Sequence, residues 1–143
     1  MSDAALGDAY RLDDQVGYLL RLAAQRHAAI FAERAEAGLT PTQFAAVMRL
    51  AEHGPRSQNE LGRLAAMDIS TIKGVVDRLR EKGLVETRPA PEDRRRHLVS
   101  LTADGERAVG PLAVAGHAIT EATLEPLTPA ERRTLVRLLR KLG

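Results

Sequence analysis

Arg94, Arg95 and Arg96 follow one another in the chain, with Asp93 before them and His97 after them. Guanidinium groups form charge-assisted hydrogen bonds with phosphate oxygens, so this cluster suits contact with a nucleic-acid backbone. A cationic run of this kind is equally compatible with a solvated loop. The elements around it must decide between the two interpretations.

A second group of polar side chains stands earlier in the chain. Ser70, Thr71 and Lys73 carry hydroxyl and ammonium donors, and Gly74 has no side chain. On the first turns of a helix these donors could face base edges, and Gly74 would let the helix approach a duplex closely. Ser70 and Thr71 could instead only support the start of the helix, and Lys73 could simply be exposed. Arg78, one turn later, suits an ion pair or a phosphate contact better than base recognition.

The chain offers little for catalysis or metal binding. It has no cysteine, and its four histidines, at positions 27, 53, 97 and 117, are scattered. Glycine-rich nucleotide loops and the H-E-x-x-H pattern are absent. We therefore predict no catalytic residue, no metal site and no cofactor, and the lack of cysteine excludes thiol-based redox sensing. An acidic, polar start and the absence of a long apolar run predict a cytoplasmic protein without a membrane partner.

Helix-start signals divide the chain into elements. A capping residue is followed three positions later by Gln or Glu at Thr40, Ser57 and Thr128, a pattern that predicts capping boxes, and Asp68 predicts a further cap. The short helix after Ser57, a turn at Met67 and a second helix ending near Lys82 and Gly83 have the form of a helix-turn-helix. The second of these helices, with its polar leading turns, would be the recognition helix.

The arginine run lies between two short alternating segments, 84–88 and 97–101. Such segments around a proline-rich charged loop predict a β-hairpin with a basic tip. Residues 54–101 carry ten Lys and Arg against seven Asp and Glu, so positive charge is concentrated in this segment of a chain whose net charge is +2. We expect a winged helix-turn-helix lobe at about residues 40–101.

Long amphipathic segments flank this lobe. The first runs from Leu12 to about Glu36 and is stopped by Gly38; the last has Leu135, Leu138, Leu139 and Leu142 on one side. Aromatic residues make up 3% of the chain, so the core must be built from aliphatic side chains, which favours packed helices. The sequence predicts a single domain over residues 1–143, mainly α with a small β-hairpin wing.

The segment 93–105 resembles the D-x-R … L-T-x-x-G signature of the MarR (multiple antibiotic resistance regulator) family. Segments 68–71, 76–79 and 82–85 are similar to that family's recognition helix and its turn into the wing. The resemblance covers about residues 12–142. It implies a homodimer held by terminal helices, about residues 10–37 and 102–143 in this chain.

The resemblance also implies that the dimer regulates transcription from a double-stranded, pseudo-palindromic DNA operator, with repression as the expected sign. The recognition helices would enter major grooves and the wings flanking minor grooves. Arg95 is similar to the family's minor-groove arginine, and Asp93 is placed to pair with it. Arg94, Arg96 and His97 are better suited to phosphate contacts. A winged-helix protein–protein adaptor is the alternative, but an adaptor would be expected to lose the basic wing and the polar turn that this chain retains.

The resemblance also implies a response to small molecules, often aromatic acids, so we expect such an effector as a partner of this protein. Arg26 and His27 lie at the edge and in the centre of the first helix's apolar stripe and could pair with a carboxylate. His27 could instead be a hydrogen-bonded core or interface residue, and Arg26 could bridge to an acidic neighbour. Arg21 points away from the stripe and ranks below them.

Overall fold

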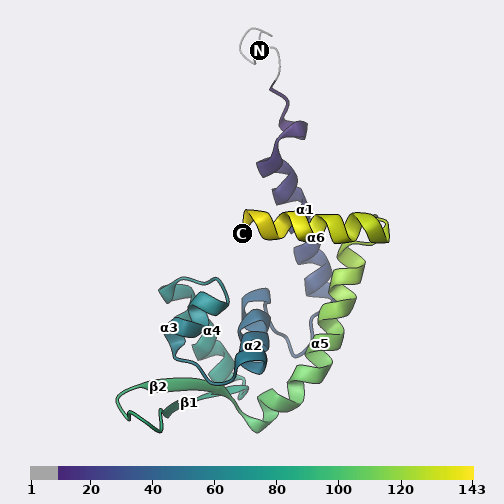
Figure 1. The fold of residues 1–143 in the computed structure, drawn as a ribbon. Helices are drawn as coiled ribbons and strands as arrows, with labels where there is room; N and C mark the ends of the chain where they lie inside the picture. The colour runs from purple at the N-terminus through teal and green to yellow at the C-terminus, as the bar shows by residue number, and fades with distance from the viewer. Residues whose placement is uncertain (1–9) are drawn as a thin grey trace. The chain divides into compact units, whose positions relative to one another are not determined.

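The computed structural model describes residues 10–143. Along the chain these residues form the 3₁₀ helix η2 (Leu12–Asp14), α1 (Val16–Arg34), α2 (Pro41–His53), α3 (Gln58–Leu64), α4 (Ile69–Glu81), β1 (Val85–Pro89), β2 (His97–Leu101), α5 (Ala103–Thr123) and α6 (Pro129–Leu142) (Figure 1). The predicted fold class, mainly α with a β-hairpin wing, is confirmed. Residues 1–9 of the predicted domain lie outside the described residues.

The chain forms two compact units. Residues 34–118 make up the first, which we call the lobe, and residues 10–33 with 119–143 make up the described part of the second, which we call the helical unit. Helix α5 contributes to both, because the boundary between Ala118 and Ile119 falls within it. The helix-turn-helix and the hairpin both belong to the lobe.

The lobe is built around one aliphatic core. Helices α2, α3 and α4 pack against one another, β1 packs beside α4, and β2 packs beside α2 and α3. The largest fully buried side chains are Leu61, Ile72, Leu79, Leu112, Val47 and Val76. Val47 lies on α2, Leu61 on α3 and Leu112 on α5, and the other three lie on α4. Burial of these side chains supplies the main stabilisation of the lobe.

The predicted caps form, with one difference. Thr40 and Thr128 make complete capping boxes with Gln43 and Glu131. The hydroxyl of Ser57 accepts a hydrogen bond from the backbone N–H of Glu60, as expected, but the Glu60 carboxylate does not return to the backbone of Ser57. The prediction of a complete third capping box is therefore wrong, because this carboxylate has other partners.

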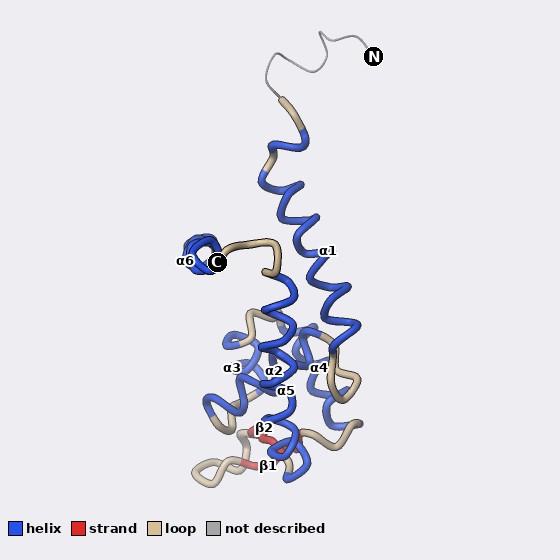
Figure 2. The backbone as a smooth tube through the Cα atoms, turned by 90° about the vertical axis from the view of Figure 1, so that its right-hand side faces the viewer, coloured by secondary structure: helices blue, strands red, loops and turns tan. Residues whose placement is uncertain are grey.

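The hairpin is anchored to the lobe at its base. Strands β1 and β2 pair antiparallel, with Val85 opposite Leu101 and Pro89 opposite His97, and Figure 2 shows them together at one end of the lobe. Val99 also exchanges two backbone hydrogen bonds with Arg56, at 3.1 and 2.8 Å. The buried side chain of Val99 lies in the core. These contacts fix the base of the wing next to the helix-turn-helix.

A tight junction links β2 to α5. The Thr102 hydroxyl donates to the carbonyl oxygen of Gly83 at 2.6 Å and accepts from the backbone N–H of Gly105 at 3.0 Å. A Cβ atom at Gly105 would lie 2.1 Å from the carbonyl oxygen of Leu84. Only glycine fits at this position. The threonine and glycine of the L-T-x-x-G pattern thus hold the wing, the end of α4 and the start of α5 together.

The helical unit leaves most of its apolar side chains exposed. Helix α1 ends at Arg34, slightly before the predicted end near Glu36, and both Ala37 and Gly38 have positive φ angles that turn the chain. Helix α6 has no buried residue at all. Val16 is 66% exposed and Leu142 is 70% exposed. The apolar faces of these two helices have no covering partner within the described residues of one chain.

Candidate nucleic-acid interface

The start of α4 is organised by Asp68. Its carboxylate accepts a hydrogen bond from the backbone N–H of Thr71 at 2.8 Å and another from the Ser70 hydroxyl at 3.1 Å. The hydrogen bonds from Thr71, and then that from Ser70, lower the pKa of Asp68. The hydroxyl of Ser70 therefore does support the helix start, while its oxygen still has free acceptor positions.

One face of α4 is buried and the other is polar. Ile72, Val75, Val76 and Leu79 point into the lobe, whereas Ser70, Thr71, Lys73, Gly74 and Arg78 are exposed. Lys73 pairs with Asp77 at 3.4 Å and Arg78 with Glu81 at 3.9 Å. Exposed pairs of this kind are weak, so both cations are available to an incoming phosphate. No atom outside the helix backbone lies within 4 Å of a Cβ placed on Gly74, which leaves this side of the helix open.

The loop between β1 and β2 is a structured turn. The backbone N–H of Ala90 donates to the carbonyl of Arg96 at 2.7 Å, and Ala90 itself is buried. Asp93 accepts a hydrogen bond from the backbone N–H of Arg95 at 3.0 Å. No ion pair between the side chains of Asp93 and Arg95 occurs within the part of the chain that the structure describes. Asp93 therefore positions Arg95 through its backbone, not through the guanidinium as the sequence suggested.

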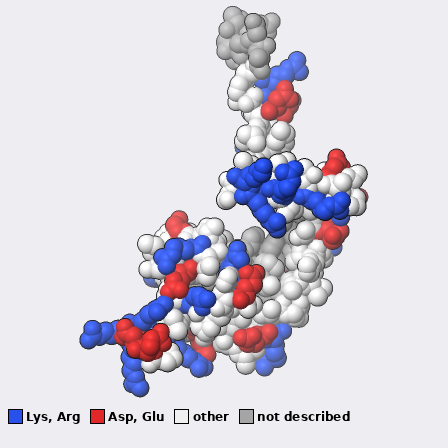
Figure 3. Space-filling model, viewed as in Figure 1, with Lys and Arg blue, Asp and Glu red and all other residues white. Residues whose placement is uncertain are grey.

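The three arginines of the wing have different surroundings. Arg96 pairs with Glu60 of α3 at 2.5 Å and with Glu92 at 3.8 Å. Among residues 10–143, no ion pair or side-chain hydrogen bond engages the guanidinium groups of Arg94 or Arg95, and cationic side chains, all of them arginines, project from the wing in Figure 3. His97 is exposed at the start of β2. Arg96 is thus the arginine that ties the wing to the helix-turn-helix, and Arg94 and Arg95 are free to bind a ligand.

Glu60 is the acidic partner at the centre of this junction. Its carboxylate accepts a hydrogen bond from the Ser57 hydroxyl at 3.0 Å and lies 3.8 Å from Nε of Arg56. The hydrogen bond from Ser57, followed by the interactions with Arg96 and the charge of Arg56, lowers the pKa of Glu60. The carboxylate stays ionised at neutral pH and holds the base of the wing against α3.

The two residues predicted to contact an effector lie together in the helical unit. Arg26 donates hydrogen bonds to the carbonyl oxygens of Ala122 and Thr123, at 3.0 and 3.3 Å, and Nδ1 of His27 lies 2.9 Å from Oγ1 of Thr123. Arg26 therefore bonds the last carbonyls of α5, which a helix end leaves without intrahelical partners. The suggested bridge from Arg26 to an acidic neighbour is not found within the described residues.

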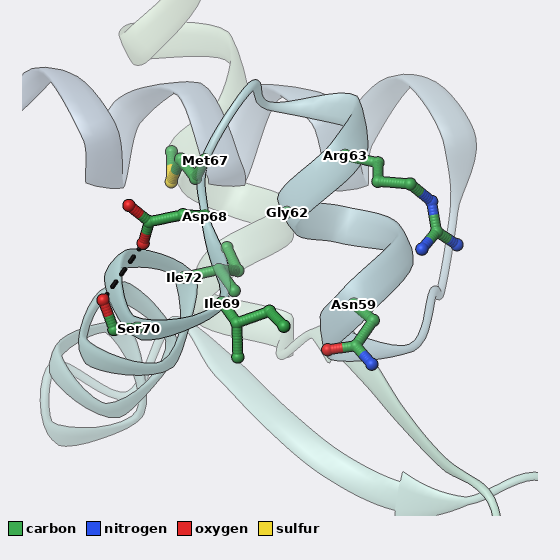
Figure 4. A pocket seen from close by; sticks show the side chains of 8 residues that line it. All are labelled: Asn59, Gly62, Arg63, Met67, Asp68, Ile69, Ser70 and Ile72. Carbon is green, nitrogen blue, oxygen red and sulfur yellow. Dashed lines mark hydrogen bonds between the residues drawn. The ribbon is translucent and has the colours of Figure 1, made fainter.

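Three exposed side chains that the sequence analysis did not single out surround a depression between α3 and α4. Asn59 and Arg63 come from α3 and Ile69 from the first turn of α4, and the depression has a volume of about 590 Å³ (Figure 4). The sequence could have indicated that Ile69 is exposed, because it directly follows the helix cap at Asp68 and precedes Ser70 and Thr71. It was missed because an isoleucine spaced three residues before Ile72 suggests a buried position.

Metal-ligand clusters and membrane-spanning helices were sought among the described residues. No group of three or more His, Cys, Asp or Glu side chains lies close enough to hold a metal ion in residues 10–143. Within the same range, no helix is both long enough and apolar enough to cross a bilayer.

Comparison with known proteins gives consistent matches. A model of the MarR family matches residues 37–96. The chain is 41% identical over 134 residues to the HTH-type transcriptional repressor NicR of Pseudomonas putida, covering 93% of this chain and 85% of that protein. The crystal structure of a probable transcriptional regulator from Pseudomonas aeruginosa is 52% identical, with a TM-score of 0.88, and covers 93% of this chain and 100% of that one.

A third similar protein has a known small-molecule regulator. BpsR of Bordetella bronchiseptica, whose DNA binding is regulated by 6-hydroxynicotinic acid, is 39% identical, with a TM-score of 0.87 over 94% of this chain and 96% of that one. Both structural matches extend over the lobe and the terminal helices, so the similarity is not confined to the helix-turn-helix.

Proposed function

Because the chain belongs to the MarR family of transcriptional regulators, we propose that it acts as a homodimeric repressor that binds a pseudo-palindromic operator in the cytoplasm. Members of this family are DNA-binding transcription factors and not enzymes. The observation that carries the proposal is that one lobe presents both an exposed polar face on α4 and a basic wing anchored beside it.

The roles of the exposed residues follow from their chemistry. Ser70, Thr71 and Lys73 on the leading turns of α4 enter the major groove, where hydroxyl and ammonium groups can hydrogen bond to base edges. Gly74 allows close approach, and Arg78 contacts phosphate from the following turn. In a dimer, the two recognition helices would stand about one helical turn of DNA apart, ~34–36 Å.

One wing residue contributes to recognition of the DNA sequence, and the others position the protein on the duplex. Arg95 enters the minor groove, where the negative potential attracts an unpaired guanidinium. Asp93 supports Arg95 by fixing the turn of its backbone. Arg94 and His97 contact phosphates beside it. Arg96 does so from the position set by its ion pair with Glu60.

The helical unit supplies the dimer contacts in this proposal. Helices α1 and α6 expose a series of large apolar side chains along their length: Val16, Leu19, Leu20, Leu22, Val136, Leu138, Leu139 and Leu142. Large apolar side chains exposed in this number indicate a protein–protein interface, and a second copy of the same chain is the partner that a symmetric regulator requires. The segments involved are about residues 10–37 and 102–143.

The proposed effector is an aromatic carboxylate, such as a benzoate, a cinnamate or a hydroxylated pyridine carboxylate. Arg26 and His27 are the residues we assign to it. Their present partners are neutral oxygens of α5, and a carboxylate is a stronger partner for a guanidinium than a backbone carbonyl. Binding would release the end of α5 and favour a lobe spacing that does not fit the operator, since an effector acts only through differential affinity.

Salt-dependent binding of the purified dimer to DNA from upstream of its own gene tests the proposal. Affinity should fall steeply as salt rises, because several cations replace counterions on the phosphates. Benzoate, cinnamate and 6-hydroxynicotinate should be added in turn, and one of them is expected to release the protein. Weak binding that is indifferent to DNA sequence would overturn the repressor role and favour the adaptor.

Variants separate the effector site from the DNA site. Arg26→Ala should bind DNA as the wild type does but no longer respond to the releasing compound. Arg21→Ala is the matched control, because Arg21 is on the same helix and packs over the ring of Tyr18 at 5.7 Å instead of bonding α5. An equal loss of response in both variants would refute the assignment of Arg26.

A further inference from the structure

Ile69 is placed unusually for an aliphatic residue of the lobe. Its side chain is 72% exposed, and among residues 40–101, all of which the structure describes, no other large apolar side chain is exposed. A single exposed aliphatic residue is by itself unremarkable. Ile69, however, stands on the leading turn of α4 beside the exposed Ser70 and Thr71, on the face proposed to contact DNA.

The surroundings keep Ile69 pointing outward. A Cβ on Gly62 would lie 3.1 Å from Cγ2 of Ile72, so α3 and α4 are in close contact below the depression. Figure 4 shows the Ile69 side chain directed across the depression toward Asn59, with Ile72 next to it on the same helix. Ile72, which is 1% exposed, thus fills the contact between the two helices, and Ile69 lies outside it.

The chemistry of the depression argues against an anionic small molecule as its occupant. The Asp68 carboxylate lines it and already accepts hydrogen bonds from Ser70 and Thr71. Arg63 lines the depression as well, so one positive and one negative charge face a ligand there and an anion gains no net attraction. In the major groove, in contrast, the C5-methyl group of thymine is the one apolar feature of the four bases, and an aliphatic side chain between polar donors matches it.

We propose that Ile69 reads the C5-methyl group of a thymine in each half-site of the operator, with the Asn59 amide facing the same or the adjacent base pair. This inference rests on the proposed DNA-binding function and deepens it by naming the base that the lobe selects. Ile69 would thus contribute to sequence specificity, while Arg94 and Arg96, as phosphate contacts, contribute mostly to affinity.

Replacing thymine by deoxyuridine tests the inference directly, because this change removes the methyl group and keeps base pairing. Upstream DNA of the gene is amplified once with dTTP and once with dUTP, and the dimer is titrated with both duplexes. The wild type should bind the uracil duplex about three- to five-fold more weakly for each thymine methyl group that Ile69 reads. Ile69→Ala should bind the thymine duplex more weakly, and both duplexes equally.

Control variants make the result specific. Ile69→Val keeps an aliphatic side chain and should retain most of the preference for thymine. Val114→Ala removes a similar side chain, 71% exposed on α5, and should leave the ratio of the two affinities unchanged even if the dimer is weakened. Thermal unfolding should show that Ile69→Ala remains folded, as expected for an exposed helical site where alanine is favourable.

The outcomes separate the two proposals. Specific binding of the thymine duplex with no preference over the uracil duplex would overturn the role of Ile69 and leave the repressor function intact. The same weakening on uracil DNA for the wild type and Ile69→Ala would trace the effect to the duplex and also overturn it. Absence of specific binding to either duplex would overturn the DNA-binding function itself.

Discussion

The lobe exposes two large apolar side chains, Ile69 and Val114, whereas the described part of the helical unit exposes ten. The lobe buries an aliphatic core drawn from α2, α3, α4 and α5 and from both strands. Helix α6 buries nothing, although it is strongly amphipathic, with leucines on one side and arginines on the other. The lobe can therefore fold around its own core, while the helical unit needs a second surface.

The difference follows from what each unit has to do in the proposed function. A DNA-reading lobe must present polar and cationic groups in a fixed geometry, which a closed core provides. A dimerisation unit must keep apolar surface available until it meets its partner. Substitutions in the core of the lobe and on the apolar surface of the helical unit can test this difference between the two units.

Gly105→Ala should damage the lobe most severely. The added methyl group would lie 2.1 Å from the Leu84 carbonyl oxygen, a backbone atom that cannot move without shifting the junction between the wing and α5. We expect a loss of about 3 kcal/mol or more in the free energy of unfolding, measured by urea titration. Gly110→Ala, in the same helix with no atom within 4 Å, is the control and should stabilise the protein by up to ~1 kcal/mol. Equal effects would mean that Gly105 is not packed as described.

Leu139→Glu should disrupt the helical unit without affecting the lobe. A charge on the apolar side of α6 would be buried without a partner in the dimer, at a cost of ~3 kcal/mol or more, so the dissociation constant should rise at least about 100-fold. Sedimentation velocity measures the change. Arg137→Glu, two residues away and on the opposite side of the helix, should leave the dimer intact. Dissociation of both variants, or of neither, would contradict the division of α6 into two faces.

Arg95→Ala should weaken operator binding by roughly 10- to 100-fold while the dimer and the fold stay unchanged. Its guanidinium has no partner in the described chain, so the variant keeps every internal interaction. Arg88→Ala is the matched control, since Arg88 lies in β1 of the same wing but is paired with Glu86. Fluorescence anisotropy at two salt concentrations measures both. An unchanged affinity for Arg95→Ala would remove the wing from the proposed interface.

Local signals in the sequence predicted most of the elements of the lobe. The caps at Thr40, Asp68 and Thr128, the helix-turn-helix and the hairpin all depend on residues close together in the chain, where helix and strand periodicities are informative. The hairpin could be placed because alternating segments flank a proline-rich loop. The family resemblance, carried by the wing and the L-T-x-x-G pattern, is confirmed by the relatives found.

Contacts between distant residues could not be predicted in the same way. The ion pair of Arg96 with Glu60 joins residues 36 positions apart, and the hydrogen bonds of Arg26 reach carbonyls 96 and 97 positions away. Their partners depend on how whole elements pack. Ile69 shows the converse problem, because its spacing from Ile72 indicates burial, whereas its side chain is 72% exposed on the first turn of α4. The assignment of individual residues to DNA and effector stays a prediction.

The smallest effect is expected at the cap of α4, where Asp68→Asn separates charge from capping. Asparagine also caps helices, so stability at pH 7 should fall only slightly. The pKa of Asp68 is lowered from its ordinary value of 3.8, chiefly by the hydrogen bonds from Thr71, so the ionised carboxylate stabilises the folded lobe above that value. This contribution is lost as the pH falls below about 4 and through the lowered pKa.

Urea midpoints from pH 6 to pH 3 should therefore differ between the wild type and Asp68→Asn at first and then converge. Glu60 and Glu131, whose pKa values are also lowered, titrate in both proteins and cancel from the difference. A constant difference down to pH 3 would show that the charge of Asp68 does not stabilise the helix that carries the polar face.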